Sequence, residues 1–189
     1  MAEVFSKFDL VPGDLAPDFS LPDASGKFHS RKESAGPNGM LLVFACNHCP
    51  FVTHLAAELG DFSREILKRG VSTVAINSND IQKYPQDGPE PMLQFAKEMH
   101  WNFPYLIDAS QEVAKSYGAA CTPDFFLFDG RATLFYAGQF DETRPRSGKK
   151  PHGADLRDAV NRMLAGESPP RSSLPSSGCN IKWLPATSD

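Results

Sequence analysis

Two cysteines separated by two residues carry the clearest chemical signal in this chain. Cys46 and Cys49 directly follow the apolar run 40–44, and a segment with helical spacing begins after Pro50. Thiols at spacing i, i+3 in the first turn of a helix can reach the S–S distance of about 2.05 Å that a disulfide requires. The helix N-terminus favours a thiolate, because its partial positive charge and free backbone N–H groups stabilise negative charge. The pair is therefore expected to carry out thiol–disulfide exchange.

The position of each thiol predicts its role. Cys46 is expected to stay exposed at the helix tip and to attack, whereas Cys49 lies one turn deeper and resolves the mixed disulfide. The intervening Asn47 and His48 are expected to tune the couple. A neighbouring His⁺ or helix N-terminus lowers a cysteine pKa from near 8.5 to roughly 3.5–7.5. Protonated His48 should therefore favour the thiolate.

The same residues allow two other interpretations. The cysteines could be two buried side chains that lie near each other without a shared function, although the strand-then-helix context favours chemistry. Alternatively, Cys46, His48, Cys49 and Cys121 could supply four ligands to a metal ion. No second C-x-x-C and no H-x-x-x-H motif accompanies them, so the prediction is that the site holds no metal.

Alternating strand and helix patterns should place the pair between a buried strand and a helix. Continuous apolar runs predict strands, whereas apolar residues at helical spacing predict helices. An Asp129-Gly130 turn predicts a hairpin. The expected strands cover 16–23 (entering a hairpin), 40–45, 71–77, 105–107, 125–128 and 132–137. The expected helices cover a turn within 30–39 and the segments 50–69, 92–100, 112–117 and 154–165. The remaining segments, 78–91 and 141–153 among them, are expected to be mostly loop. This order predicts a mixed sheet with helices on both faces.

Length and composition bound the class of protein. The chain has 189 residues, 41% of them hydrophobic and 22% charged, with a net charge of −4. These values predict one globular domain and no nucleic-acid or anionic-membrane footprint. Residues 1–8 resemble no signal peptide, and no apolar run approaches the ~20 residues of a membrane helix. Four cysteines are too few for a disulfide scaffold, so a reducing, cytoplasmic setting is expected.

Several short motifs, in the same order along residues 12 to 166, carry a resemblance to a known family. The chain resembles the thioredoxin superfamily, in particular its alkyl hydroperoxide reductase/thiol-specific antioxidant (AhpC/TSA) type. The matching pieces are Ala16-Pro17-Asp18-Phe19-Ser20-Leu21-Pro22, the Cys46–Cys49 pair after a strand, Tyr117-Gly118 followed by Thr122-Pro123, and Phe126-Leu127-Phe128-Asp129-Gly130.

The resemblance implies a thioredoxin-like α/β fold, in which a central mixed sheet of about five strands is flanked by helices. The residue pattern predicts an N-terminal β-hairpin, and composition predicts an extended Ser/Pro-rich tail over 167–189 that follows a redoxin domain over residues 1–166. The resemblance also implies a cis Thr122–Pro123 bond, with Pro123 packed against the cysteine pair and presenting backbone groups to a substrate. Cys121 would then lie nearby, and we interpret it as a packing residue in preference to a third redox thiol.

Two chemistries occur in proteins of this type, and they use the cysteines differently. Thioredoxin-like members use both thiols, whereas peroxiredoxins use one peroxidatic cysteine in the pattern P-x-x-x-T-x-x-C followed by proline. Cys49-Pro50 matches the end of that pattern. However, Cys46 stands at the threonine position, Leu42 at the proline position, and Pro123 at the position of an arginine that activates peroxide. These departures favour the dithiol chemistry.

We therefore predict a thiol–disulfide oxidoreductase that acts on protein disulfides or thiols without an organic cofactor. The rival predictions are a thiol peroxidase with antioxidant activity that uses Cys49, and a non-enzymatic metal-binding or redox-sensing module. Cys179 lies in the tail, where it could return to the site as a resolving thiol. As an isolated cysteine, it is interpreted as inert.

Overall fold

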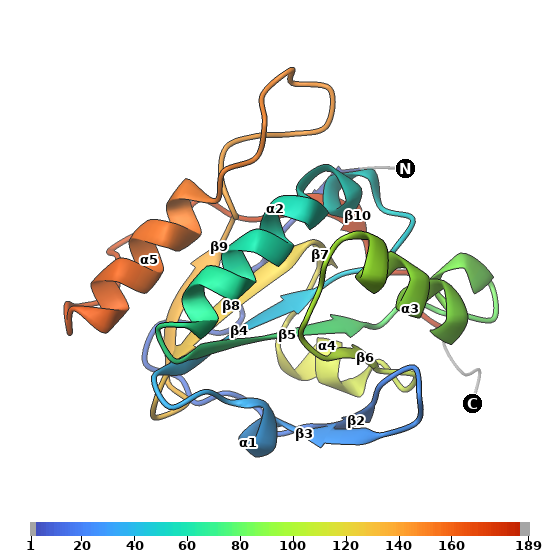
Figure 1. The fold of residues 1–189 in the computed structure, drawn as a ribbon, viewed down its shortest axis with the longest axis horizontal. Helices are drawn as coiled ribbons and strands as arrows, with labels where there is room; N and C mark the ends of the chain where they lie inside the picture. The colour runs from blue at the N-terminus through green and yellow to red at the C-terminus, as the bar shows by residue number, and fades with distance from the viewer. Residues whose placement is uncertain (1–2, 186–189) are drawn as a thin grey trace.

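A five-stranded mixed sheet forms the centre of the molecule. The structure is a computed structural model, and it describes residues 3–185. Strand β8 pairs antiparallel with both β4 and β9, and β5 pairs parallel with β6. Strands β4 and β5 lie side by side (Figure 1), where the Ala45 N–H donates to the Ile76 carbonyl at 2.9 Å. The strands are β4 (Gly39–Phe44), β5 (Val71–Asn77), β6 (Tyr105–Ile107), β8 (Asp124–Asp129) and β9 (Leu134–Gly138).

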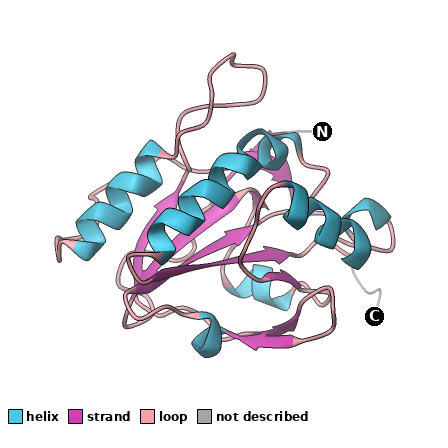
Figure 2. Cartoon of the chain, in the orientation of Figure 1, coloured by secondary structure: helices cyan, strands magenta, loops and turns pink. Residues whose placement is uncertain are grey.

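Helices cover both faces of this sheet (Figure 2), as the sequence predicted. Side chains alternate between the two faces of a strand, and β4 shows the result. Leu41 and Val43 face a core cluster shared with α2, α3 and α5, whereas Leu42 and Phe44 face one shared with α4 and the N-terminal hairpin. The helices are α2 (Pro50–Leu67), α3 (Pro89–Glu98), α4 (Glu112–Ser116) and α5 (Ala154–Leu164).

The predicted N-terminal hairpin is confirmed. It consists of β2 (Ser20–Pro22) and β3 (Phe28–Ser30), paired antiparallel. The short helix α1 (Arg31–Ser34) follows, and the Ser30 side chain caps it by accepting from the Glu33 N–H. Within the expected loop 78–91, a single 3₁₀ turn, η1 (Pro85–Asp87), precedes α3. That turn reaches the candidate site.

The C-terminal segment contains a strand that sequence reasoning did not predict. Strand β10 (Ser177–Asn180) lies between β1 (Glu3–Phe5) and β7 (Cys121–Thr122), antiparallel to both. Backbone pairing to two distant segments attaches this part of the chain to the domain and buries Cys179. The division of the chain at residue 166 stays a prediction.

Among the described residues, no helix combines the length and apolar character needed to cross a membrane. The longest helix, α2, is amphipathic. Its buried side chains include Val52, Leu55, Leu59 and Ile66, which recur at the helical period and face the sheet.

Candidate active site

The cysteine pair lies between the end of β4 and the start of α2. Cys49 is the N-cap of α2 and Pro50 occupies its first turn, where proline is favoured because it has no backbone N–H to leave unpaired. Cys46 lies in the short connection after β4. The prediction that Cys46 is exposed at the helix tip is wrong, since its exposed fraction is 1% and that of Cys49 is 0%. Strand β10 and the 3₁₀ turn η1 fold over a position that would be open if only β4 and α2 were present.

Thr122 and Pro123 contact the pair from the other side of the site. The Thr122–Pro123 bond is cis, as expected from the resemblance. Thr122 Oγ1 lies 3.4 Å from Cys46 Sγ, and the Cys49 thiol donates to the Thr122 carbonyl at 3.0 Å. One residue of β7 thus contacts both sulfur atoms, through its hydroxyl and through its backbone.

The two thiols have opposite pKa shifts. The hydrogen bond from Cys46 lowers the pKa of Cys49 to about 5, and further donors from Thr122 and Cys179 outweigh the effect of burial. The pKa of Cys46 is raised, because the hydrogen bond to Cys49 keeps the proton on Cys46, and burial and the Asp87 carboxylate act in the same direction. When Cys49 is protonated it donates to the Thr122 carbonyl instead. The directions of these shifts favour Cys49 as the thiolate of the reduced pair, whereas the sequence analysis expected Cys46.

A buried aspartate holds the connection between the two cysteines, and sequence reasoning missed it. Asp87 is fully buried in η1. Its Oδ1 accepts the backbone N–H groups of Asn47 at 2.9 Å and His48 at 3.3 Å. Its Oδ2 contacts His48 Nδ1 at 2.6 Å and accepts from Asn79 Nδ2 at 2.9 Å. These partners satisfy a carboxylate that would otherwise be costly to bury.

The side chains of the two predicted tuning residues are held in place by neighbouring residues. The Asn47 side chain donates to the Gln86 carbonyl and accepts from the Tyr105 hydroxyl at 3.0 Å. The His48 ring stacks on Tyr84, with ring centroids 5.5 Å apart. Its Nε2 is buried and has no hydrogen-bond partner within residues 3–185. The local sequence signal for this arrangement was only a carboxylate in a Pro/Gly-rich loop after a buried strand.

The two remaining cysteines occupy different environments. Cys179 is 2% exposed and pairs with Thr122 between β10 and β7, and hydrogen bonding from it contributes to the lowered pKa of Cys49. Cys121 is fully buried, and its thiol contacts the Pro123 carbonyl at 3.5 Å. Burial is the main cause that raises the pKa of each of these two thiols. The structure thus brings Cys179 into contact with the pair.

The metal-ligand set considered from the sequence differs from the group that the fold brings together. Within the described residues, potential ligand atoms of Cys46, His48 and Asp87 lie within 4.8 Å of one another. This group contains Asp87, which the sequence analysis did not include, and lacks the expected ligands Cys49 and Cys121. Its carboxylate and the His48 Nδ1 are already engaged with each other at 2.6 Å.

Solved structures and curated sequences show what this chain is similar to. A crystal structure of an uncharacterized conserved protein from Geobacillus kaustophilus superposes with a TM-score of 0.94 at 42% identity, covering 99% of both chains. Peroxiredoxin Bcp of Escherichia coli (strain K12) is 30% identical over 109 residues, which are 58% of this chain and 65% of that protein. The thiol-disulfide oxidoreductase ResA of Geobacillus thermodenitrificans is 29% identical over 123 residues, 65% of this chain and 66% of that protein.

The matches to these curated relatives span about two thirds of their length, 65% for Bcp and 66% for ResA. The fold is thioredoxin-like, as the sequence predicted, since solved thioredoxin-like proteins superpose over most of the chain. The model of the AhpC/TSA family matches residues 12–137, a range that includes the cysteine pair and the Thr122–Pro123 bond. The chain belongs to the AhpC/TSA family.

Proposed function

We propose that the protein is a thiol–disulfide oxidoreductase whose redox pair is Cys46 and Cys49. One observation carries the proposal: two reduced, hydrogen-bonded thiols with opposite pKa shifts lie against Thr122, next to the cis Pro123. A low-pKa thiolate attacks a disulfide, and a protonated neighbour within reach resolves the product. The relationship to ResA, a thiol-disulfide oxidoreductase, supports this chemistry.

The order of attack follows from the position of the charge. The Cys49 thiolate attacks one sulfur of a substrate disulfide, which releases the other as a thiolate and leaves a mixed disulfide on Cys49. The Cys46 thiol then loses its proton and attacks the Cys49 sulfur, which releases the second substrate thiol and forms the Cys46–Cys49 disulfide. Two electrons pass from the pair to the substrate. This order reverses the roles expected from the sequence, in which Cys46 attacks.

A redox titration with mapping of all four cysteines tests the proposal. The reduced protein is equilibrated in thiol buffers of graded potential, alkylated, and analysed by mass spectrometry. Cys46 and Cys49 should convert together as one two-electron couple. If the Cys46–Cys49 disulfide never forms, the proposed pair is wrong.

Single variants then separate the two orders of attack. Cys46→Ser and Cys49→Ser are assayed for reduction of insulin disulfides with dithiothreitol as electron donor, and Cys121→Ser serves as the buried-thiol control. Loss of the attacking thiol should abolish even formation of a mixed disulfide with oxidised glutathione. We expect that loss for Cys49→Ser. A glutathione adduct on Cys46 in that variant would restore the order predicted from the sequence.

His48 remains the proposed tuning residue, through the connection that it shares with Asp87. Its ring nitrogen lies within 4.8 Å of the Cys46 sulfur while in contact with the carboxylate. A protonated imidazole there stabilises nearby negative charge. His48→Ala should therefore raise the midpoint of thiolate formation, measured from the absorbance at 240 nm. His54→Ala is the matched control, because His54 contacts Thr143 instead. Equal midpoints in both variants would remove His48 from the tuning role.

Peroxide reduction is the second candidate, and the low pKa of Cys49 at the N-cap of α2 favours it. The thiolate would attack a peroxide oxygen to give a sulfenic acid and release an alcohol or water. A second thiol then condenses with the sulfenic acid to a disulfide and releases water. The relationship to peroxiredoxin Bcp supports this candidate. Stopped-flow consumption of hydrogen peroxide by the reduced protein, compared with Cys49→Ser, tests it and the antioxidant role together.

The proposed substrates are protein disulfides or thiols, with peroxide under the second candidate, in a reducing, cytoplasmic setting. A hollow lined by Phe51, Pro123, Phe125 and Arg144 among others includes the cis proline, which an approaching chain would contact. Stoichiometric zinc together with negligible turnover on disulfides and peroxides would instead support the metal-binding module.

A further inference from the structure

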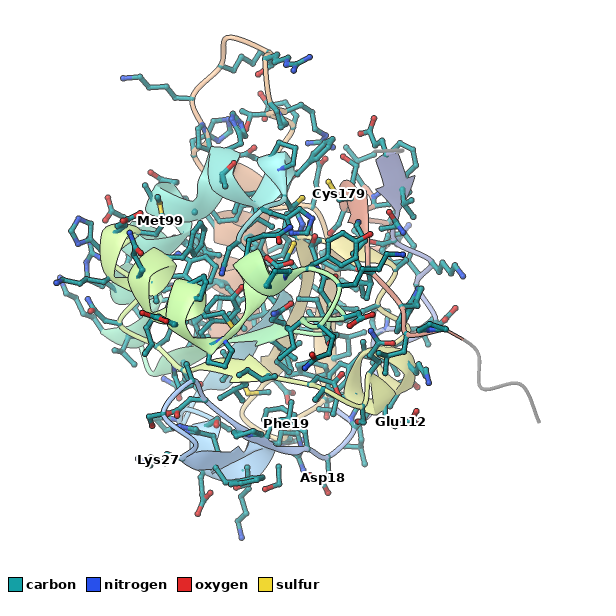
Figure 3. All side chains as sticks on the ribbon, turned by 90° about the vertical axis from the view of Figure 1, so that its right-hand side faces the viewer. Asp18, Phe19, Lys27, Met99, Glu112 and Cys179 are labelled. Carbon is teal, nitrogen blue, oxygen red and sulfur yellow. The ribbon has the colours of Figure 1, made fainter. Side chains whose placement is uncertain are left out.

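Cys49 has two thiol neighbours, one close in sequence and one from the C-terminal part of the chain. The first is Cys46, three residues earlier in the same connection. The second is Cys179 on β10, which pairs with Thr122, the residue whose carbonyl accepts from the Cys49 thiol at 3.0 Å. All three cysteines belong to one buried cluster, and Figure 3 shows Cys179 on the C-terminal strand β10. Cys46, Cys49 and Cys179 are called the three-thiol cluster below.

The fold holds Cys179 in place on a paired strand. In the β7–β10 ladder Cys179 is the partner of Thr122, the residue that contacts both Cys46 and Cys49. On the other side of β10, Cys179 pairs with Glu3 of β1. Gly178 permits a close approach, because a Cβ at this position would lie 2.0 Å from the Thr122 carbonyl oxygen.

Cys121 lies on the opposite side of the same ladder. It is the partner of Asn180, one residue along from the Cys179–Thr122 pair, and successive side chains on a strand point to opposite faces. Its thiol contacts the Pro123 carbonyl at 3.5 Å. Cys121 is thus a buried thiol of the same small sheet that faces away from the cluster.

We propose that Cys179 is a third redox thiol, which accepts Cys49 into a Cys49–Cys179 disulfide. This inference rests on the proposed function. In the mixed disulfide, the Cys179 thiol loses its proton and its sulfur attacks the Cys49 sulfur. The Cys49–Cys179 bond forms, the bond between Cys49 and the substrate breaks, and the substrate leaves as a thiol that takes the proton. The same attack on a Cys46–Cys49 disulfide transfers the bond to Cys179 and returns Cys46 to the thiol state, with no net change in electrons.

The charge on Cys49 controls when Cys179 can react. Burial, together with the hydrogen bond and charge of Cys49, raises the pKa of Cys179 to about 12 in the reduced cluster. A mixed disulfide on Cys49 carries no charge. The contribution of Cys49 to the raised pKa of Cys179 is then lost. Cys179 is therefore easier to deprotonate at the stage when a disulfide on Cys49 is present for it to attack.

The test traps the attack on Cys49 in a chain that lacks Cys46. Reduced full-length Cys46→Ser is treated with oxidised glutathione, alkylated, digested and mapped by mass spectrometry. We expect a Cys49–Cys179 disulfide and little retained glutathione. The double variant Cys46→Ser/Cys179→Ser should retain glutathione on Cys49. The control Cys46→Ser/Cys121→Ser should behave like Cys46→Ser.

Retained glutathione on Cys49 in both Cys46→Ser and Cys46→Ser/Cys179→Ser would overturn the proposal while leaving the thiolate chemistry intact. Failure of the proposed function looks different: Cys46→Ser then takes up no glutathione at Cys49, and both proposals fall. If Cys46→Ser loses its native circular dichroism, the wild type gives the answer. Partly oxidised wild type should contain peptides joined through both Cys46–Cys49 and Cys49–Cys179, and the first disulfide alone would contradict the proposal.

Discussion

The carboxylate of Asp87 lies 2.6 Å from His48, measured between Oδ2 and Nδ1, while its other oxygen accepts the backbone N–H of Asn47 at 2.9 Å. One buried side chain therefore fixes both residues that separate the cysteines. Asp87 comes from a turn some forty residues later in the chain, the sequence separations being 39 and 40. The geometry of the redox pair thus depends on a segment that carries no thiol.

Asp87→Ala should destabilise the fold markedly. It would leave the Asn47 and His48 backbone donors and the Asn79 amide without their acceptor, and each unpaired buried group costs about 1–3 kcal/mol. We expect the free energy of unfolding to fall by about 3 kcal/mol, because partial relaxation admits water. Urea denaturation measures this change. Asp61→Ala is the control, since Asp61 pairs with Arg64 at the surface. Equal losses in both variants would mean that Asp87 does not hold the site.

The Cys49 thiolate should persist to low pH. Its pKa is lowered to about 5, so the absorbance of a thiolate at 240 nm should decline with a midpoint near that pH and be absent from Cys49→Ser. The rate of mixed-disulfide formation should follow the same curve, constant above the midpoint and falling below it, because only the thiolate attacks. Cys179→Ala should move the midpoint upward, since it removes a thiol donor. An unchanged midpoint would show that Cys179 does not stabilise the charge.

Asp124, which directly follows Pro123, should make stability depend on pH. Burial raises its pKa from 3.8 to about 6, although Ser6 and Ala120 donate to it. Between these two values the folded state binds more protons than the unfolded chain, so the stability that this group contributes is lost as pH rises through the window. A shift of two units corresponds to about 3 kcal/mol. Asp124→Asn should remove most of this slope in urea denaturation from pH 4 to pH 7.

The exposed Asp158 provides the control for that series. Asp158→Asn should leave the slope of the wild type unchanged, because the Asp158 side chain stays exposed in the folded chain. If Asp124→Asn keeps the full slope as well, the pH dependence comes from other groups.

Gly178→Ala should displace β10 from β7. The added methyl group would meet the Thr122 carbonyl oxygen at 2.0 Å, so the strands must separate, and overpacking of this kind costs about 1–3 kcal/mol. Transferred into Cys46→Ser, the substitution should also reduce the yield of the Cys49–Cys179 disulfide. Ser177→Ala is the neighbouring control, because the Ser177 hydroxyl is buried without a partner within the described residues and its removal should be nearly neutral. Identical stabilities for the two variants would contradict the close packing of β10.

Local sequence pattern was enough to predict the elements around the redox pair and the chemistry that they can support. Apolar runs and helical spacing depend on neighbours only a few residues apart, so the strand before Cys46, the helix after Pro50 and strand Val71–Asn77 were predictable from local pattern. The thiol spacing and the Thr122-Pro123 motif likewise identified the candidate residues and the thioredoxin-like fold.

The burial of those residues depends on tertiary contacts that local sequence pattern does not reveal. Asp87 and Cys179 reach the pair from η1 and β10, and no periodicity in the sequence links these segments to Cys49. Their hydrogen bonds act over a few ångströms, so they exist only once the chain has brought distant residues together. The same long-range contacts cover Cys46, which is why the exposure expected from a helix tip alone differs from that in the folded chain.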